Sequence, residues 1–301
     1  MKRKVQIAVL SDLHLGTYGC HAKEVYNYLN SIDPEFLILN GDIIDIWAFK
    51  KKYFPIEHFM VIDAIAKIAS KGTPVYYITG NHDDLLRRFS GLKVGSFRLE
   101  DKLVLVINKK KHWFFHGDVF DASIQHSKWI AKLGGKSYGM LIRINRAINW
   151  LLVRMGKEKM SFSKKIKHSV KKAVKFIGDF EHTAGELAIE KGYHYVICGH
   201  IHNPQIRTIQ NSNGETVYMN SGDWVESLTA LEYVDDEWSI YHYDEDQNNN
   251  HDMEEEISFK DKWSSEFNKN FVEDFVTSHF VPNFSSYENI LRHSRNEKSP
   301  I

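Results

Sequence analysis

Short apolar runs that end abruptly in polar residues dominate the first 80 positions of the chain. The first run covers residues 5–10, and similar runs stand at 36–40 and 75–79. Between them, 22–30 and 57–70 are predicted helices, and in the second of these the apolar residues recur at three- and four-residue intervals. This alternation of strand and helix, with glycine-containing turns after strands, predicts βαβ units and a parallel sheet.

Further along the chain the apolar runs are shorter and more closely spaced. They lie at 103–107, 113–116, 195–198, 216–219, 228–233 and 238–243. We expect these runs to form a second sheet that is partly antiparallel. A long helical region is predicted between residues 116 and 195. Beyond about residue 244 the pattern weakens, which predicts a partly irregular or helical tail at 245–301.

Polar clusters follow five of the predicted strands. They are Asp12-Leu13-His14, Gly41-Asp42-Ile43-Ile44-Asp45, Gly80-Asn81-His82-Asp83, His116-Gly117-Asp118 and Gly199-His200-Ile201-His202. Because ligands of open α/β sheets gather at the carboxyl ends of strands, we expect these side chains to meet at one edge. Asp, Asn and His ligands without thiolate favour Mn²⁺, Fe²⁺ or Zn²⁺. Any single cluster fits an ordinary turn, but five of them after apolar strands predict a metal site.

Composition excludes several classes of protein. Lys plus Arg and Asp plus Glu both number 39, and the resulting zero net charge argues against a wholesale polyanion binder. Two cysteines, Cys20 and Cys198, leave little scope for a disulfide framework and favour a reducing compartment. The first apolar run is too short for a signal peptide, and no stretch approaches the roughly 18 apolar residues of a membrane span. We therefore expect a soluble, cytoplasmic protein.

The zero net charge conceals two opposed blocks. Residues 128–175 contain 14 Lys/Arg and one acid, whereas 235–256 contain 10 acids and no Lys or Arg. The acidic block is typical of a solvated connector. The basic block carries two helical apolar stripes, Leu141, Ile144, Ile148, Leu151 and Met155, and Ile166, Val170, Ala173, Val174 and Ile177. Such a pair fits a lid over acyl chains at an anionic lipid surface, an ordinary hairpin packed on the core, or a nucleic-acid patch.

In this order the five clusters resemble the calcineurin-like metallophosphoesterase superfamily, whose pattern is D-x-H, G-D-x-x-D, G-N-H-[DE], H and G-H-x-H. The resemblance implies an α/β fold, a four-layer αββα sandwich at 1–244 with a helical lid insertion at about 122–190. It also implies two divalent metal ions, for which we expect Mn²⁺, with Zn²⁺ or Fe²⁺ as alternatives. One ion would be held by Asp12, His14, Asp42 and His202, and the other by Asp42, Asn81, His116 and His200.

The reaction that this resemblance implies is phosphoester or pyrophosphate hydrolysis. A water between two divalent cations is acidified enough to exist as hydroxide near neutral pH and to attack phosphorus in line. His82 would protonate the leaving oxygen or donate a hydrogen bond to the phosphoryl group. Asp83 would orient the ring of His82, and its alternative role is that of a helix cap alone.

Four segments, 41–47, 116–121, 199–204 and 221–224, resemble the UDP-2,3-diacylglucosamine pyrophosphatase branch. Enzymes of that branch act in lipid A biosynthesis, releasing UMP and 2,3-diacylglucosamine 1-phosphate from a nucleotide-linked lipid, and a helical insertion covers the acyl chains. The resemblance would place this chain at the inner membrane face. The best-known members carry Arg where His82 stands here, so a soluble phosphodiesterase or nuclease acting on nucleotides or nucleic acid is the alternative. The complete ligand set argues against a non-catalytic scaffold of the same fold.

Overall fold

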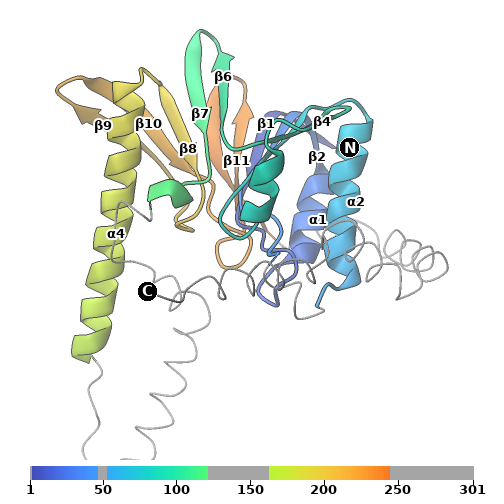
Figure 1. Ribbon diagram of the computed structural model, residues 1–301, viewed down its shortest axis with the longest axis horizontal. Coiled ribbons are helices and arrows are strands. Elements are labelled where there is room, and N and C mark those ends of the chain that lie inside the picture. Colours follow the sequence, from blue (N-terminus) through green and yellow to red (C-terminus); the bar gives the residue numbers. More distant parts are fainter. Residues whose placement is uncertain (1, 47–52, 121–162, 245–301) are drawn as a thin grey trace, which may run out of the picture. The chain divides into compact units, whose positions relative to one another are not determined.

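Two β-sheets lie face to face at the centre of the fold (Figure 1). The structure is a computed structural model that describes residues 2–46, 53–120 and 163–244, with side chains of the last range from residue 174 onward. The larger sheet has the strand order β12 (Glu237–His242), β11 (Thr229–Val234), β1 (Arg3–Leu10), β2 (Ile32–Asn40), β3 (Val75–Ile78), β5 (Phe97–Glu100), β4 (Lys93–Val94). The smaller sheet has the order β6 (Leu103–Ile107), β7 (Lys110–Phe114), β8 (Tyr195–Cys198), β10 (Gly214–Asn220), β9 (Gln205–Asn211).

Parallel pairing in the larger sheet confirms the predicted βαβ organisation. Strands β1, β2, β3 and β5 are neighbours and run parallel. Both faces of β1 are covered over its second half, which explains why residues 7–10 form a continuous apolar run. Ala8 and Leu10 contact the core on the helical side, whereas Ile7 and Val9 lie in the core between the sheets.

Helices cover the outer face of each sheet. They are α1 (Ala22–Ser31), α2 (Ile56–Ser70) and α4 (Ser163–Glu190), with the short 3₁₀ helices η2 (Asp84–Phe89) and η3 (Asp118–Phe120). Helix α1 buries Val25, Tyr28 and Leu29 in the core it shares with α2 and the larger sheet. Helix α4 buries Phe180, Ala184 and Ala188 against the smaller sheet. The layers are therefore helix, sheet, sheet and helix, which confirms the expected four-layer αββα sandwich.

The last two strands belong to a different sheet from the one expected. Strand β11 pairs antiparallel with β1, with Leu231 opposite Val9, and β12 pairs with β11, so both extend the larger sheet. A two-residue turn joins β11 to β12, and its central residues, Asp235 and Asp236, have φ of 50° and 66°. Positive φ at both central positions is the geometry of a tight type I′ hairpin.

Helix α4 contains the C-terminal part of the predicted insertion at 122–190. Its described residues from Phe180 onward pack on the smaller sheet as an outer layer of the sandwich. The rest of the insertion, with its first apolar stripe, falls at 121–162 and lies outside the described residues, as does the predicted tail at 245–301. Among the described helices, none has both the length and the apolar character needed to cross a membrane.

Candidate metal centre

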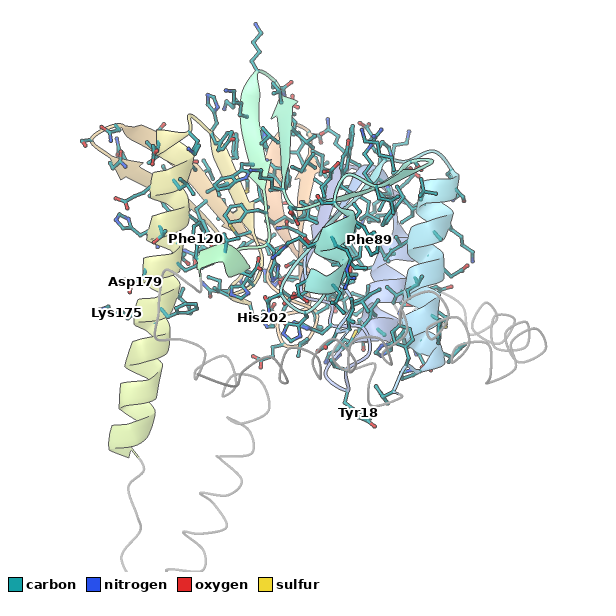
Figure 2. The ribbon with its side chains drawn as sticks, in the orientation of Figure 1. Tyr18, Phe89, Phe120, Lys175, Asp179 and His202 are labelled. Atoms are coloured by element: carbon teal, nitrogen blue, oxygen red, sulfur yellow. The ribbon has the colours of Figure 1, made fainter. Side chains whose placement is uncertain are left out.

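The ends of strands from both sheets supply the polar residues of one site. Asp12 and Asp42 each lie two residues after a strand of the larger sheet, β1 and β2. His116 and His200 each lie two residues after a strand of the smaller sheet, β7 and β8, which run parallel to each other. Figure 2 shows His202 at this edge, and in that view it lies between Phe89 of η2 and Phe120 of η3.

Five of the candidate ligands have left-handed backbone, a feature that the sequence pattern did not reveal. The φ angles are 54° at Asp12, 52° at His14, 55° at Asp42, 69° at His200 and 51° at His202. Such backbone is uncommon outside glycine and costs on the order of 1–3 kcal/mol per residue, so it concentrates at functional sites. Hydrogen bonds between the loops maintain it, including those from Asp12 N to Gly41 O and from His14 N to Asp42 O, both 3.0 Å.

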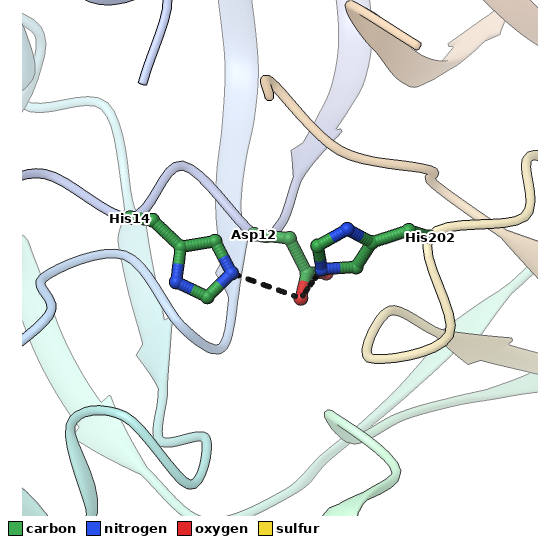
Figure 3. A group of neighbouring side chains, drawn as sticks. All are labelled: Asp12, His14 and His202. Atoms are coloured by element: carbon green, nitrogen blue, oxygen red, sulfur yellow. Dashed lines mark hydrogen bonds and ion pairs between the residues drawn. The ribbon is translucent and has the colours of Figure 1, made fainter. Parts of the chain in front are cut away.

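The first ligand group consists of Asp12, His14 and His202 (Figure 3). Oδ1 of Asp12 lies 3.1 Å from Nε2 of His202 and 3.8 Å from Nε2 of His14. Oδ2 of the same carboxylate accepts the backbone N–H of His200 at 3.0 Å. Burial by itself would raise the pKa of Asp12, but the neighbouring His202 and His116 rings lower this pKa to about 2. The carboxylate is therefore ionised and ready to bind a cation.

The second ligand group consists of Asp42, His116 and His200. Nε2 of His116 lies 3.2 Å from Oδ2 of Asp42. Nδ1 of His116 donates to the carbonyl of Asn40 at 3.0 Å, which leaves Nε2 as the atom that faces the site. Burial disfavours the charged ring, but Asp42 and Asp12 outweigh it and raise the pKa of His116 well above its usual value. Asn40, the last residue of β2, is a positioning residue that the polar clusters did not indicate.

Asn81, the remaining predicted ligand, has an unsatisfied side-chain oxygen. Its Oδ1 is buried and has no hydrogen-bond partner among the described residues. A buried amide oxygen in this state loses its hydration without compensation, so a cation is a suitable partner for it. The oxygen and imidazole donors that meet here fit divalent metal ions of the Mn²⁺, Fe²⁺ and Zn²⁺ class.

Two glycines allow the second group to come together. A β-carbon on Gly41 would overlap the His116 ring, and one on Gly80 would overlap the Asp42 carboxylate. Gly41 also has φ of +88°. Only glycine permits so close an approach of backbone to these side chains.

The His82 ring contacts Asp45 rather than Asp83. Nδ1 of His82 lies 3.0 Å from Oδ2 of Asp45. Burial opposes charging of the ring, but the hydrogen bond to Asp45 and the charge of Asp42 raise the pKa of His82. The side chain of His82 remains 37% exposed, so an incoming ligand can reach it.

The carboxylate of Asp83 accepts hydrogen bonds from two backbone N–H groups and a tyrosine hydroxyl. It accepts hydrogen bonds from the N–H of Ile43 at 3.0 Å, the N–H of Gly80 at 2.6 Å and the hydroxyl of Tyr77 at 2.6 Å. Asp83 therefore shapes the loop that carries Asn81, and the contact expected between Asp83 and His82 is made by Asp45 instead. Asp45 was visible in the sequence as the last residue of the second cluster, but its partner was not.

The chain is similar to several known proteins. The calcineurin-like phosphoesterase family model matches residues 5–204. A UDP-2,3-diacylglucosamine hydrolase of Aliivibrio fischeri is 26% identical over 242 residues, which cover 78% of this chain and 97% of that protein. The DNA double-strand break repair protein Mre11 of Methanococcus maripaludis is 24% identical over 245 residues, covering 76% and 60%. The structure of a dimetal phosphatase from Danio rerio aligns over 79% of this chain and 98% of its own at 12% identity, with a TM-score of 0.38.

The family match spans all five polar clusters, and its C-terminal end at residue 204 lies just beyond His202. The chain belongs to the calcineurin-like phosphoesterase family and is a metal-dependent phosphoester hydrolase.

Proposed function

We propose that this protein is a dimetal phosphohydrolase that converts UDP-2,3-diacylglucosamine to UMP and 2,3-diacylglucosamine 1-phosphate. The observation that carries the dimetal part is that two groups with no residue in common, Asp12, His14 and His202 and Asp42, His116 and His200, lie at one sheet edge. A third group, His14, Asp45 and His82, shares His14 with the first. In the proposal Asp12, His14, Asp42 and His202 hold one ion, and Asp42, Asn81, His116 and His200 hold the other. We propose Mn²⁺ in both positions, because the donors are oxygen and imidazole.

Bound divalent cations would supply the acidified water and the charge neutralisation that phosphoryl transfer requires. Among the protein's own groups, His82 is the proposed proton donor. Asp45 accepts a hydrogen bond from Nδ1 of His82 and so fixes the orientation of the ring, which leaves Nε2 for the substrate. Despite burial, the hydrogen bond to Asp45 and the charge of Asp42 raise the pKa of His82, which favours the protonated ring. The proton on Nε2 is donated to the leaving oxygen or shared with the phosphoryl group.

The lipid-linked substrate rests on the relatives and on the basic insertion. Several relatives named UDP-2,3-diacylglucosamine hydrolase match at 21–26% identity. We propose that the insertion at about 122–190 covers acyl chains and that its lysines and arginines contact an anionic membrane surface. The protein would then act at the inner face of the membrane, in lipid A biosynthesis.

A second candidate is a metal-dependent phosphodiesterase or nuclease acting on nucleotides or nucleic acid. The observation that favours it is His82, which stands where the best-known enzymes of the lipid branch carry arginine. An imidazole paired with Asp45 can donate a proton to the leaving oxygen of many phosphodiesters, and it is not selective for a lipid.

Phosphorus NMR distinguishes the two candidates. The Mn²⁺-loaded protein is incubated with UDP-2,3-diacylglucosamine, the unacylated UDP-sugar or bis-p-nitrophenyl phosphate, beside a His116→Ala variant. We expect UMP from the acylated compound alone, and no UMP from the variant. Turnover of the generic diester without the lipid would support the phosphodiesterase and refute the lipid substrate.

A further inference from the structure

Arg87 lies in η2, directly after the loop that carries Asn81, His82 and Asp83. Its Nε donates to Oδ1 of Asp101 at 3.1 Å and to Oγ1 of Thr79 at 3.3 Å. Its Nη2 donates to Oδ2 of Asp118 at 3.0 Å. One guanidinium group thus contacts three separate segments of the chain.

These contacts connect the two sheets at the edge where the metal centre lies. Thr79 and Asp101 each directly follow a strand of the larger sheet, β3 and β5. Asp118 is the first residue of η3 and follows β7 of the smaller sheet. In Figure 1, η2 is the teal helix and η3 the short green helix, each near the lower ends of the strands in that view.

Arg87 and its partner Asp118 each lie shortly after a proposed ligand, and these two ligands hold the same ion in the proposed function. Asn81 lies six residues before Arg87, and His116 lies two residues before Asp118. Asn81 and His116 come from different sheets, so packing between the sheets and contacts between the loops set their separation. A metal site tolerates little error in that separation, because ligand distances vary by only about 0.2 Å.

We infer that Arg87 is a positioning residue that, through Asp118, sets the spacing of Asn81 and His116 and so the affinity for the second ion. This inference rests on the proposed dimetal function. The planar guanidinium is suited to the task, since it directs donors along fixed directions to carboxylates on both sides. A lysine has one ammonium group and cannot make the same fork of hydrogen bonds.

A matched ion pair elsewhere in the protein separates positioning from general stabilisation. Arg3 donates to both oxygens of Glu232 at 2.9 Å, with side-chain exposures of 45% and 6%. The Arg87–Asp118 pair is similar, with exposures of 37% and 12%. Arg3 begins β1, at the opposite end of that strand from Asp12, so its pair cannot align the ligand loops.

The experiment is titration calorimetry of the metal-free full chain with Mn²⁺, together with thermal unfolding of the same samples. We expect two ions in the wild type and, in Arg87→Ala, a loss of about 10- to 100-fold in affinity for one ion only. Arg87→Lys should recover part of this loss, and Arg3→Ala should bind both ions as the wild type does. Adding Asp118→Ala to Arg87→Ala should cause little further loss, because the two residues act as a pair.

The outcomes separate this inference from the proposed function. Two ions bound with wild-type affinity by Arg87→Ala, with an unfolding temperature lowered as in Arg3→Ala, would show that Arg87 only stabilises the fold. If Arg87→Ala does not fold, Asp118→Asn keeps the shape of the partner and must show the same loss for one ion. A wild type that binds fewer than two ions would refute the dimetal function, and the inference with it.

Discussion

At the scale of single residues, the metal centre is built on backbone that most side chains avoid. Asp12, Asp42 and His202 all have φ near +50°. Asp and His tolerate left-handed backbone better than most residues, but which of them adopt it here depends on hydrogen bonds between loops, which no short motif contains. The residue types of the ligands can thus be predicted from the sequence, whereas their backbone conformation depends on contacts formed in the folded protein.

Replacement of Gly80 by alanine tests the close packing around Asp42. The added methyl group would meet the Asp42 carboxylate and its backbone N, with the His116 ring 2.9 Å away. These neighbouring atoms are held in place by the packing of the site, so the added methyl group would displace the ligands Asp42 and His116. We therefore expect fewer than two bound ions and at least about tenfold lower turnover of bis-p-nitrophenyl phosphate. Metal analysis and steady-state kinetics check this. The control is Gly178→Ala in α4, where the methyl group meets nothing within 4 Å, and an equal loss there would contradict the account.

Replacing Asp45 and Asp83 by asparagine should affect different properties of the protein, turnover in the first case and stability in the second. In Asp45→Asn we expect kcat to fall by about 10- to 100-fold with unchanged metal content, because the orientation of His82 is lost. In Asp83→Asn we expect a lower unfolding temperature, because three donors lose a charged acceptor. Kinetics, metal analysis and thermal unfolding of both variants check this. If only Asp83→Asn lost turnover, the result would contradict this account and show that Asp83, not Asp45, orients the His82 ring.

His58 makes stability depend on pH. The residue is 3% exposed, and Nδ1 of its ring accepts the N–H of Gly16 at 2.7 Å. Burial lowers the pKa of His58 from 6.5 to about 4. The unfolded chain takes up a proton below pH 6.5 and the folded protein only near pH 4, so stability falls as the pH drops across this window. The loss is on the order of 3 kcal/mol, at 1.36 kcal/mol per pKa unit.

The measurement for His58 is urea unfolding at several pH values. His112 also has its pKa lowered to about 4 by burial and contributes to the same window. The difference between the wild type and His58→Gln isolates His58, because the contribution of His112 is common to both proteins. That difference should shrink as the pH falls from 6.5 to 4. A difference that is constant with pH would show that the ring is not held neutral.

At the scale of elements, the packing of α4 on the smaller sheet can be tested by measuring protein stability, without any substrate. Phe180 is fully buried, and its ring lies 5.5 Å from Phe120 and 6.1 Å from His200. Phe180→Ala should lower the free energy of unfolding by about 3–5 kcal/mol, measured with urea. Phe176→Ala, one turn earlier and only partly buried, should cost less. Equal effects of the two changes would contradict the observed packing of α4.

Elements were predictable where the apolar signal was strong. The runs at 5–10, 36–40 and 75–79 are buried strands of the larger sheet, as expected. Strand β9 was not predicted, because it lies at an edge and Ile209 is its one buried residue. The sheet to which β11 and β12 belong was predicted wrongly, since an alternating pattern fixes which faces are buried and not which strand becomes the neighbour.

At the scale of the whole molecule, the sequence indicated that the candidate ligands meet, but not what holds them together. Parallel strands predict a shared edge for Asp12, Asp42 and Asn81. The position of the second sheet, which brings His116 and His200 to the same place, depends on packing between sheets over the whole core. The contact of Arg87 with Asp118 belongs to that packing, and no short motif contains both residues.

Metal removal should weaken the whole fold, because the site joins loops from both sheets. Ions that bind only the folded state stabilise it by about 2.7 kcal/mol at a concentration one hundred times the dissociation constant. We therefore expect the unfolding temperature to fall when a chelator is added to the wild type. Asp42→Asn should show a much smaller response to the chelator. A wild type that unfolds at the same temperature with and without chelator would contradict a metal site that spans the sheets.

The central claim is that two divalent ions occupy one edge of the sandwich, and anomalous diffraction from crystals grown with Mn²⁺ tests it most directly. We predict two anomalous peaks about 3.5–4 Å apart, with the carboxylate of Asp42 between them. One peak should lie beside His14 and His202, and the other beside His116 and His200. A single peak, or peaks away from these side chains, would contradict the account.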